Sequence, residues 1–263
     1  MRIDAHIHGS VTGFRGDPEA YVAACRERGV EAVVLIEDLA TCLEAVTTFG
    51  DFIIPVARIP MNTATPSDVD RCLEAGCKGI KFIRPVAPYA DPRYWPLYAQ
   101  IEDAGAVAVF HTGYLAFRKR EDPPVHMEHM RAAQVEAIAR RFPALKILMA
   151  HFSNPWWEEA WKVSLSTPNV YADLSGGTAI LRSTRMWAEM FAPDGQLLEA
   201  SVRKLCFASD VRYFRDKEDS PDAFAFDRYI DFYNRIFDAI DLPASLRAQV
   251  NRGNARMLFG LDD

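Results

Sequence analysis

The sequence predicts an α/β fold, a single-domain (β/α)8 TIM barrel that spans residues 1–263. The first observation is length, because 263 residues suit one such barrel, which typically has about 250. The second is the alternation of short β-rich runs with helical segments along the whole chain, which is typical of βα units around a parallel sheet. The third is the number of runs, since eight strands close a barrel.

The predicted strands and helices follow one another in regular order. The strands are residues 1–8 (MRIDAHIH), 31–37 (EAVVLIE), 52–59 (FIIPVARI), 79–84 (GIKFIR), 106–112 (AVAVFHT), 146–152 (KILMAHF), 169–175 (NVYADLS) and 204–210 (KLCFASD). Asp17-Pro18 offers a helix N-cap with proline at the first helical position, and Gly29 can end that helix. Thr65-Pro66 and Gly76 repeat this pattern. Further helices are predicted at residues 94–104, 130–142, 155–166, 185–191 and 222–240.

Two connections are longer than is usual between a strand and a helix, residues 113–129 and 211–222. Both follow C-terminal strand ends, where barrels bind their substrates, so they are predicted to act as lids or specificity elements. A surface excursion is the alternative. His126 and His129 lie in the first of them and are more simply interpreted as surface residues. The aromatic stretch at residues 224–237 has helical spacing and predicts a packing face, which can include a subunit interface.

Composition excludes several classes of partner. The formal net charge is −6 without basic clusters, which argues against nucleic acid. No apolar run approaches the roughly 20 residues of a membrane-spanning helix. The first residues lack the pattern of a secretory signal, so a cytoplasmic protein is expected. The five cysteines have no C-x-x-C spacing, which disfavours a disulfide framework or a cysteine zinc site. A small-molecule substrate is the remaining expectation.

Four histidines and one aspartate at the ends of predicted strands suggest a metal site. His6 and His8 are two residues apart in the first strand, so their imidazoles point to one face. His111, His151 and Asp210 end the fifth, sixth and eighth runs. A lone histidine at a strand end is more often hydrogen-bonded scaffold, but the set as a whole favours ligation. Neutral imidazoles with a carboxylate suit zinc, manganese or iron(II).

Several motifs together resemble the amidohydrolase superfamily. They are Asp4-Ala5-His6-Ile7-His8, Lys78-Gly79-Ile80-Lys81-Phe82, His111-Thr112-Gly113, His151, Asp173-Leu174-Ser175-Gly176, Ser209-Asp210 and residues 254–261 (NARMLFGL). Within the superfamily the chain most resembles the amidohydrolase-related branch that includes aminocarboxymuconate-semialdehyde decarboxylase. The resemblance runs from the first residues nearly to the last.

This resemblance implies roles for the strand-end residues. His6, His8 and His111 bind one divalent metal ion, and Asp210 completes the site. Zinc is the expected ion, with manganese and iron as alternatives. His151 is the catalytic histidine, and together with Asp210 it activates a water molecule whose pKa the metal lowers. A homodimer is compatible with the branch.

Other strand-end residues have two interpretations each. Glu37 is a further metal ligand or the partner of a neighbouring cation. Lys81 occupies a position where some superfamily members carry a carboxylated lysine between two metals, but here a mononuclear site is expected, with Lys81 on a substrate anion. Arg84 holds a substrate carboxylate or forms a surface salt bridge. Trp156 and Trp157 follow the sixth strand, and one of them, taken as Trp156, is predicted to wall the pocket and stack on a planar substrate. Asp173 fixes a histidine tautomer or caps a turn.

The leading functional prediction is a metal-dependent hydrolase that cleaves a C–O or C–N bond in a lactone, ester or amide. The first alternative is non-oxidative decarboxylation or hydration of an unsaturated or aromatic carboxylic acid, which the same branch supports. A carboxylic acid or lactone is therefore the expected substrate class. The second alternative is a non-catalytic barrel that serves as a binding protein, since the fold hosts many functions.

Overall fold

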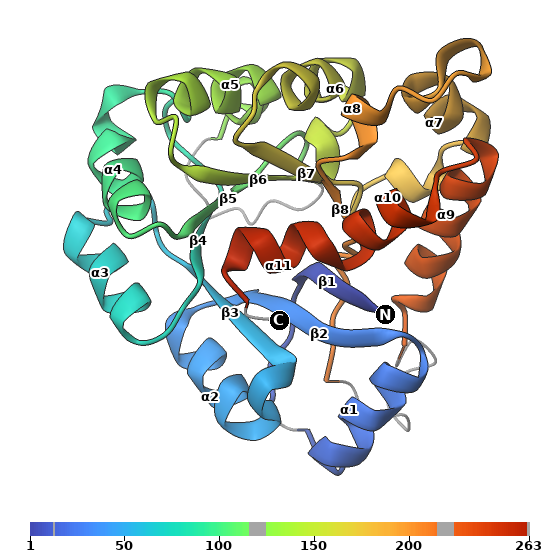
Figure 1. Ribbon diagram of the computed structural model, residues 1–263. Coiled ribbons are helices and arrows are strands. Elements are labelled where there is room, and N and C mark those ends of the chain that lie inside the picture. The colour runs from blue at the N-terminus through green and yellow to red at the C-terminus, as the bar shows by residue number, and fades with distance from the viewer. Residues whose placement is uncertain (13, 116–124, 215–223, 262–263) are drawn as a thin grey trace.

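The structure is a computed structural model that describes residues 1–12, 14–115, 125–214 and 224–261. Eight parallel strands pair in sequence order from β1 to β8, and helices surround them, so the predicted barrel is confirmed (Figure 1). The strands are β1 (Arg2–Ile7), β2 (Val30–Glu37), β3 (Ile53–Arg58), β4 (Gly79–Phe82), β5 (Val107–His111), β6 (Lys146–Ala150), β7 (Val170–Asp173) and β8 (Leu205–Cys206). Each corresponds to one predicted run, although β8 is much shorter than residues 204–210.

The helices begin largely where proline and capping residues predicted. They are α1 (Pro18–Glu27), α2 (Leu39–Phe49), α3 (Pro66–Glu74), α4 (Trp95–Asp103), α5 (Ala132–Arg141), α6 (Trp157–Ser166), α7 (Thr184–Phe191), α8 (Glu199–Val202), α9 (Asp227–Ala239), α10 (Ala244–Ala248) and α11 (Asn254–Phe259). Asp17 accepts a hydrogen bond from the backbone N–H of Glu19, and Thr65 forms a capping box with Asp68, as expected for N-caps. The sequence prediction gave no helix for α2, α8, α10 or α11.

Two apolar cores lie on opposite faces of the strands. One fills the barrel and takes alternate residues from the strands, while the other packs the outer faces of the strands against the helices. The inner core comprises Ile3, Ala5, Val34, Ile36, Ile54, Val56, Val107, Val109, Leu148, Ala150, Cys206, Ala208, Ala255, Leu258 and Phe259. Toward the C-terminal ends of the strands, the same alternate positions are occupied by polar residues, which lie over this core. These residues are Arg58, Lys81, His111, Asp173 and Asp210.

Strand β1 departs from regular alternation of its side chains near His6 and His8, two of the predicted metal ligands. Asp4 pairs with Val33 of β2 and Ile7 pairs with Leu35, so β1 contains one more residue than β2 between these pairs. Such a β-bulge turns the side chains that follow it. Ile3 and Ala5 therefore belong to the inner core, whereas Ile7 belongs to the outer core. The bulge lets His6 and His8 turn toward the barrel interior.

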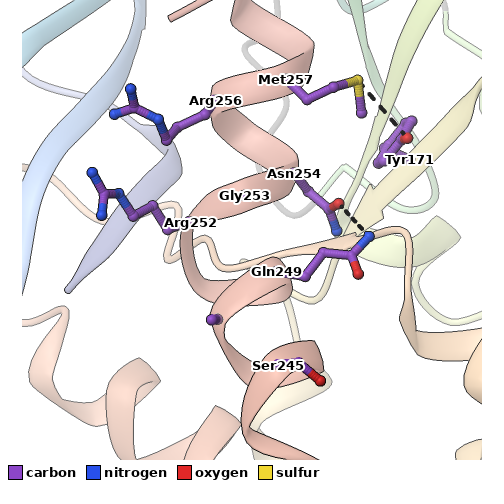
Figure 2. Close-up of a pocket in the computed structure, with 9 residues that line it drawn as sticks. Tyr171, Ser245, Gln249, Arg252, Gly253, Asn254, Arg256 and Met257 are labelled. Atoms are coloured by element: carbon purple, nitrogen blue, oxygen red, sulfur yellow. Dashed lines mark hydrogen bonds between the residues drawn. The ribbon is translucent and has the colours of Figure 1, made fainter. Parts of the chain in front are cut away.

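Helix α11 crosses the end of the barrel opposite the polar strand ends (Figure 1). Asn254 donates from Nδ2 to the carbonyls of Arg203 and Leu205, which fastens α11 to β8. A π-helical turn, Gln249–Gly253, precedes α11, and beside it lies a cavity of about 460 Å³ that Arg252, Arg256 and Met257 help to line (Figure 2). None of the predicted site residues lines this cavity. They lie at or after the C-terminal ends of the strands, at the other end of the barrel.

Helix α9 covers β7 and β8 with the aromatic face that the sequence predicted. Tyr229, Phe232 and Tyr233 are buried, and the Tyr233 hydroxyl donates to the carbonyl of Cys206 while accepting from the N–H of Leu174. This face therefore packs within the chain. Among the described helices none is long and apolar enough to span a membrane. The two predicted lid segments include residues 116–124 and 215–222, which lie outside the described residues.

Candidate metal centre

His6, His8 and Asp210 meet at the C-terminal end of the barrel. Asp210 Oδ1 lies 3.6 Å from His6 Nε2 and 3.3 Å from His8 Nε2. Potential ligand atoms of these three residues all lie within 4.8 Å of one another, which is close enough to share one metal ion. The His6 side chain is fully buried, whereas those of His8 and Asp210 are 26% and 25% exposed. The triplet is therefore open to a small ligand from the side of His8 and Asp210.

The carbonyl of Ile36 determines which nitrogen of His8 faces the triplet. His8 Nδ1 lies 2.8 Å from this oxygen, and because a carbonyl can only accept, Nδ1 carries the proton and Nε2 is free to ligate. Glu37 Oε1 lies 3.4 Å from the same Nδ1, and Glu37 Oε2 pairs with Arg58 at 3.3 Å. Burial lowers the pKa of His8, but hydrogen bonds to Asp210 and Glu37 outweigh it and raise the pKa to about 9, so without a metal the ring also carries a proton on Nε2, toward Asp210. A metal ion at this place would displace that proton and leave a neutral imidazole as its ligand. These contacts match the interpretation of Glu37 as the partner of neighbouring cations.

His6 is held between a carboxylate and an ammonium group. Its Nδ1 lies 3.5 Å from Asp173 Oδ2, and its Nε2 lies 3.4 Å from Lys81 Nζ. Burial and the charge of Lys81 lower the pKa of His6 to about 3, so the ring is neutral. A neutral ring oriented by a carboxylate on one nitrogen is a typical arrangement for a metal-binding histidine.

His151 lies between His6 and His111 in a strained turn. Its ring centroid is 4.9 Å from that of His6 and 4.6 Å from that of His111. His151, Phe152 and Ser153 all have positive φ, a conformation that residues with a side chain seldom adopt. Thr112 stabilises the turn, because its hydroxyl donates to Ala150 and accepts from the N–H of Ser153.

The hydrogen bonds of His151 select one tautomer. Nδ1 lies 3.1 Å from the carbonyl oxygen of Ser175, so the neutral ring carries its proton on Nδ1 and leaves the lone pair of Nε2 available. Burial lowers the pKa of His151, which favours this neutral form. Asp173 Oδ1 accepts from the N–H of His151 and from both the N–H and the hydroxyl of Ser175. Asp173 thus lies beside the ring of His6 with one oxygen and holds the backbone of His151 with the other. Its predicted role in fixing a histidine tautomer stays a prediction.

The donor set fits a divalent cation. His111 Nε2 is buried and has no hydrogen-bond partner among the described residues, an arrangement that normally costs free energy unless a ligand satisfies the atom. Burial lowers the pKa of His111 well below its ordinary value, so its ring is neutral. Burial alone raises the pKa of Asp210, but interactions with His151 and His8 hold it below the usual range. Neutral imidazoles and an ionised carboxylate are the ligands that zinc and similar ions prefer.

The family of the chain follows from its match to a known sequence model. The model for amidohydrolases matches residues 3–261. The chain belongs to the amidohydrolase family. The resemblance noted in the sequence is thereby confirmed, and members of this superfamily are generally enzymes that typically bind a divalent metal. A search of curated proteins found no match.

Solved structures share the barrel with this amidohydrolase at low sequence identity. An uncharacterised TIM-barrel protein from Bordetella bronchiseptica is 16% identical, with a TM-score of 0.66 and 98% of each chain covered. A probable 2-pyrone-4,6-dicarboxylic acid hydrolase from Acinetobacter baumannii, with citric acid bound, is 13% identical, with a TM-score of 0.63 and 99% of each chain covered. A 2,6-dihydroxybenzoate decarboxylase in complex with 2,6-dihydroxybenzoate is 15% identical, with a TM-score of 0.64 and coverage of 100% of this chain and 99% of that one.

The remaining predicted residues are Lys81, Arg84 and Trp156. Lys81 is buried, and its Nζ lies 3.4 Å from His6 Nε2; its predicted contact with a substrate anion stays a prediction. Arg84 follows β4 with positive φ, and its carbonyl accepts from Asn62 Nδ2. The ring of Trp156 lies under the guanidinium of Arg131, 4.4 Å from it, near the start of α5. The roles predicted for Arg84 and Trp156 in substrate binding stay predictions.

Two residues of this end of the barrel were given no role in the sequence, Arg58 and Gly176, although Gly176 belongs to the motif Asp173-Leu174-Ser175-Gly176. Arg58 ends β3 beside Lys81 of β4, and its charge acts on Lys81. Its position as a basic residue at a strand end, like Lys81, could have identified it. Gly176 lies against the site with φ +66°, and a Cβ built on it would overlap Asp210 Oδ2 and lie 2.8 Å from His151 Nδ1. No local pattern in the sequence indicated that approach.

We expect Gly176→Ala to displace Asp210 or His151 and to lower turnover strongly. Gly105→Ala is the matched control, because Gly105 has φ +64° but open space around its Cβ position. Both variants should lose about 1–2 kcal/mol of folding free energy from the left-handed backbone. Thermal unfolding and metal-dependent turnover measured on both separate the two effects. Equal turnover in Gly176→Ala and Gly105→Ala would contradict the close packing of Gly176 on the site.

Proposed function

We propose that this amidohydrolase is a metal-dependent hydrolase that cleaves a C–O or C–N bond in a small lactone, ester or amide bearing a carboxylate. The observation that carries the proposal is the orientation of His151, whose Nδ1 proton is held by Ser175 while its other nitrogen is free to accept a proton. A divalent cation held by His6, His8, Asp210 and His111 would supply Lewis-acid polarisation of the scissile carbonyl.

Different residues of the chain would perform different steps of such a reaction. His151 accepts the proton of the attacking water through Nε2 and returns it to the leaving group, since a neutral buried imidazole can act in both directions. Asp210 lies at the exposed side of the triplet and can hold a water molecule by accepting a hydrogen bond. Asp173 lies beside the ring of His6 and holds the backbone of His151, so it keeps both residues in place during proton transfer.

Lys81 and Arg58 favour an acidic substrate. Lys81 is buried, and within the described part of the chain no carboxylate forms an ion pair with it. Burial lowers the pKa of Lys81 to about 8, and the charges of Asp173 and Asp210 offset only part of the lost hydration. A substrate carboxylate in direct contact would stabilise the ammonium form further. Arg58, at the neighbouring strand end, is partly exposed and can form a bidentate pair with a carboxylate. A hydrolase with a dicarboxylic acid in its name and a decarboxylase are among the similar structures.

Non-oxidative decarboxylation of an aromatic or unsaturated acid is the second candidate. The buried ammonium of Lys81 beside His6 favours it, because decarboxylation requires the carboxylate to be held next to the reacting carbon. A hydrolase needs its scissile carbonyl at the same place and its carboxylate farther away. The position at which the substrate carboxylate binds therefore distinguishes hydrolysis from decarboxylation.

We expect zinc-dependent turnover of carboxylate-bearing lactones, esters or amides by the purified protein. A panel that pairs each acid with its neutral methyl ester, assayed with and without chelator, measures both metal dependence and charge preference. Acid release without carbon dioxide supports hydrolysis, whereas carbon dioxide release from aromatic acids supports the second candidate. Absence of any metal-dependent turnover across both classes would refute the proposed enzyme.

Arg58→Met should raise KM for the acids by about tenfold or more with a smaller change in kcat, because hydrogen bonds to charged groups contribute about 1.5–3 kcal/mol. Neutral analogues should be unaffected. Arg71→Met is the matched control, since Arg71 pairs with Asp68 on α3. An equal effect of Arg58→Met on acids and neutral analogues would contradict carboxylate recognition.

A further inference from the structure

The barrel closes between β1 and β8 by a seam that differs from its other strand pairs. Within the described chain β1 and β8 form no regular ladder, and the sheet order runs from β1 to β8. Backbone hydrogen bonds at the seam run from Ala5 N to Phe207 O and from Asp210 N to His6 O. Farther along, His8 N donates to Val211 O. Two of the proposed metal ligands, His6 and Asp210, therefore lie on opposite sides of the seam.

One buried carboxylate bridges this seam. Asp4 is fully buried, and its Oδ1 accepts from the backbone N–H of Ser209 at 2.9 Å. Its Oδ2 accepts from the hydroxyl of Ser209 at 2.6 Å and from the hydroxyl of Tyr213 at 3.1 Å. Buried carboxylates are costly unless hydrogen bonds satisfy them, and here both oxygens have partners on the far side of the seam. We call Asp4, Ser209 and Tyr213 the seam cluster.

The seam cluster also reaches the bulge of β1. Asp4 Oδ1 lies 3.4 Å from the backbone N of His6, within the stretch where β1 has its extra residue. An amide left unpaired by a bulge needs another acceptor, and the Asp4 carboxylate is in place to provide one. The same oxygen therefore contacts the backbone of His6 on β1 and that of Ser209, the residue before Asp210.

We propose that Asp4 is a positioning residue that holds the β1 bulge and closes the seam, and so sets the distance between His6 and Asp210. The proposal rests on the proposed metal centre, because its consequence is preorganisation of two ligands for one cation. The carboxylate acts through the backbone and never touches the metal or the substrate. Loss of a cluster hydroxyl should let the two sides of the seam separate, and metal affinity should fall while the fold persists.

Ser209→Ala and Ser201→Ala form a matched pair for the test. Each removes one buried serine hydroxyl that donates to an oxygen, Asp4 Oδ2 in the first case and the carbonyl of Leu198 in the second. Zinc affinity is measured by competition with a chromogenic chelator on metal-free protein. We expect Ser209→Ala and Tyr213→Phe to bind zinc about 10- to 100-fold more weakly, and Ser201→Ala to bind it as the native chain does. Native zinc affinity in both seam variants would overturn the proposal.

A conservative change distinguishes positioning from general stability. Asp4→Asn keeps one acceptor for the N–H of Ser209 and an amide that can donate to the hydroxyls, whereas Asp4→Ala keeps neither. We expect zinc affinity to fall in the order native, Asp4→Asn, Asp4→Ala. Equal affinities in the two Asp4 variants would count against the hydrogen-bonding role.

Amide hydrogen exchange followed by mass spectrometry tests the seam without any metal. In Asp4→Ala, faster exchange should be confined to residues 1–8 and 205–214, with β4 to β6 unchanged. Uniformly faster exchange, or no change at the seam, would overturn the role of Asp4. If the native chain binds no zinc, the metal centre is refuted, and the exchange pattern still decides whether Asp4 closes the seam.

Discussion

His8→Ala should bind zinc more than about 100-fold more weakly than the native chain and should lose metal-dependent turnover with it, because loss of a ligand exceeds the effect of outer contacts. The variant removes Nε2, which lies 3.3 Å from Asp210 Oδ1, and leaves only two members of the triplet. Elemental analysis of purified protein before and after chelation measures the effect. The native chain should contain about one zinc, manganese or iron per chain, as a mononuclear site requires.

His126→Ala is the control for the loss of a histidine, since His126 is exposed and contacts His129 rather than the triplet. It should retain the metal content of the native chain. Undiminished metal in His8→Ala would show that the ion binds elsewhere. Two ions per native chain would instead favour a carboxylated Lys81 between two metals, the arrangement that the mononuclear prediction set aside.

The barrel was predictable because its strands are short apolar runs separated by helices with recognisable caps. Runs such as EAVVLIE at residues 31–37 leave little choice but a buried strand, and Pro18 and Pro66 begin their helices as expected. Helix α11 was missed because its six residues, Asn254–Phe259, are too few to show a helical period. Its apolar residues Ala255, Leu258 and Phe259 plug the barrel, a tertiary role that short helices do not reveal.

Part of the site was predictable from strand ends alone. His111 and Asp210 continue the alternation of the inner core, so their position over the core follows from the period of a strand. The same rule applies to Arg58, which was overlooked. For His151 the rule correctly places the residue at a strand end. It does not predict the turn that follows, because the backbone there takes positive φ at successive residues.

The approach of His6 to the barrel interior could not be predicted from β1 alone. Regular alternation groups Ile3, Ala5 and Ile7 on one face and would turn His6 away from the inner core. The bulge reverses this arrangement after Ala5. The bulge is accompanied by a hydrogen bond between Asp4 and Ser209, which lie 205 residues apart along the chain. A hydrogen bond between such distant residues leaves no local pattern in the sequence.

His151→Ala should keep its metal and yet lose turnover by about 10²- to 10⁴-fold, the usual contribution of a positioned general acid–base group. The ring lies beside His6 and His111, and its available nitrogen is Nε2 because Ser175 holds Nδ1. Parallel measurement of metal content and kcat separates this variant from His8→Ala, in which both should be lost. The substitution leaves a cavity the size of an imidazole, so added imidazole should restore part of the turnover.

Rescue by imidazole is stronger evidence for proton transfer by His151 than the loss of turnover, because a merely structural defect would not respond to a small base. It should increase with the concentration of neutral imidazole, since only the neutral form accepts a proton. Ser175→Ala is a useful companion, because the backbone carbonyl that holds Nδ1 remains while the hydroxyl bond to Asp173 is lost. It should retain most of its turnover and show no response to imidazole. Native turnover in His151→Ala would place the proton acceptor elsewhere, and Asp210 would then be the group to test.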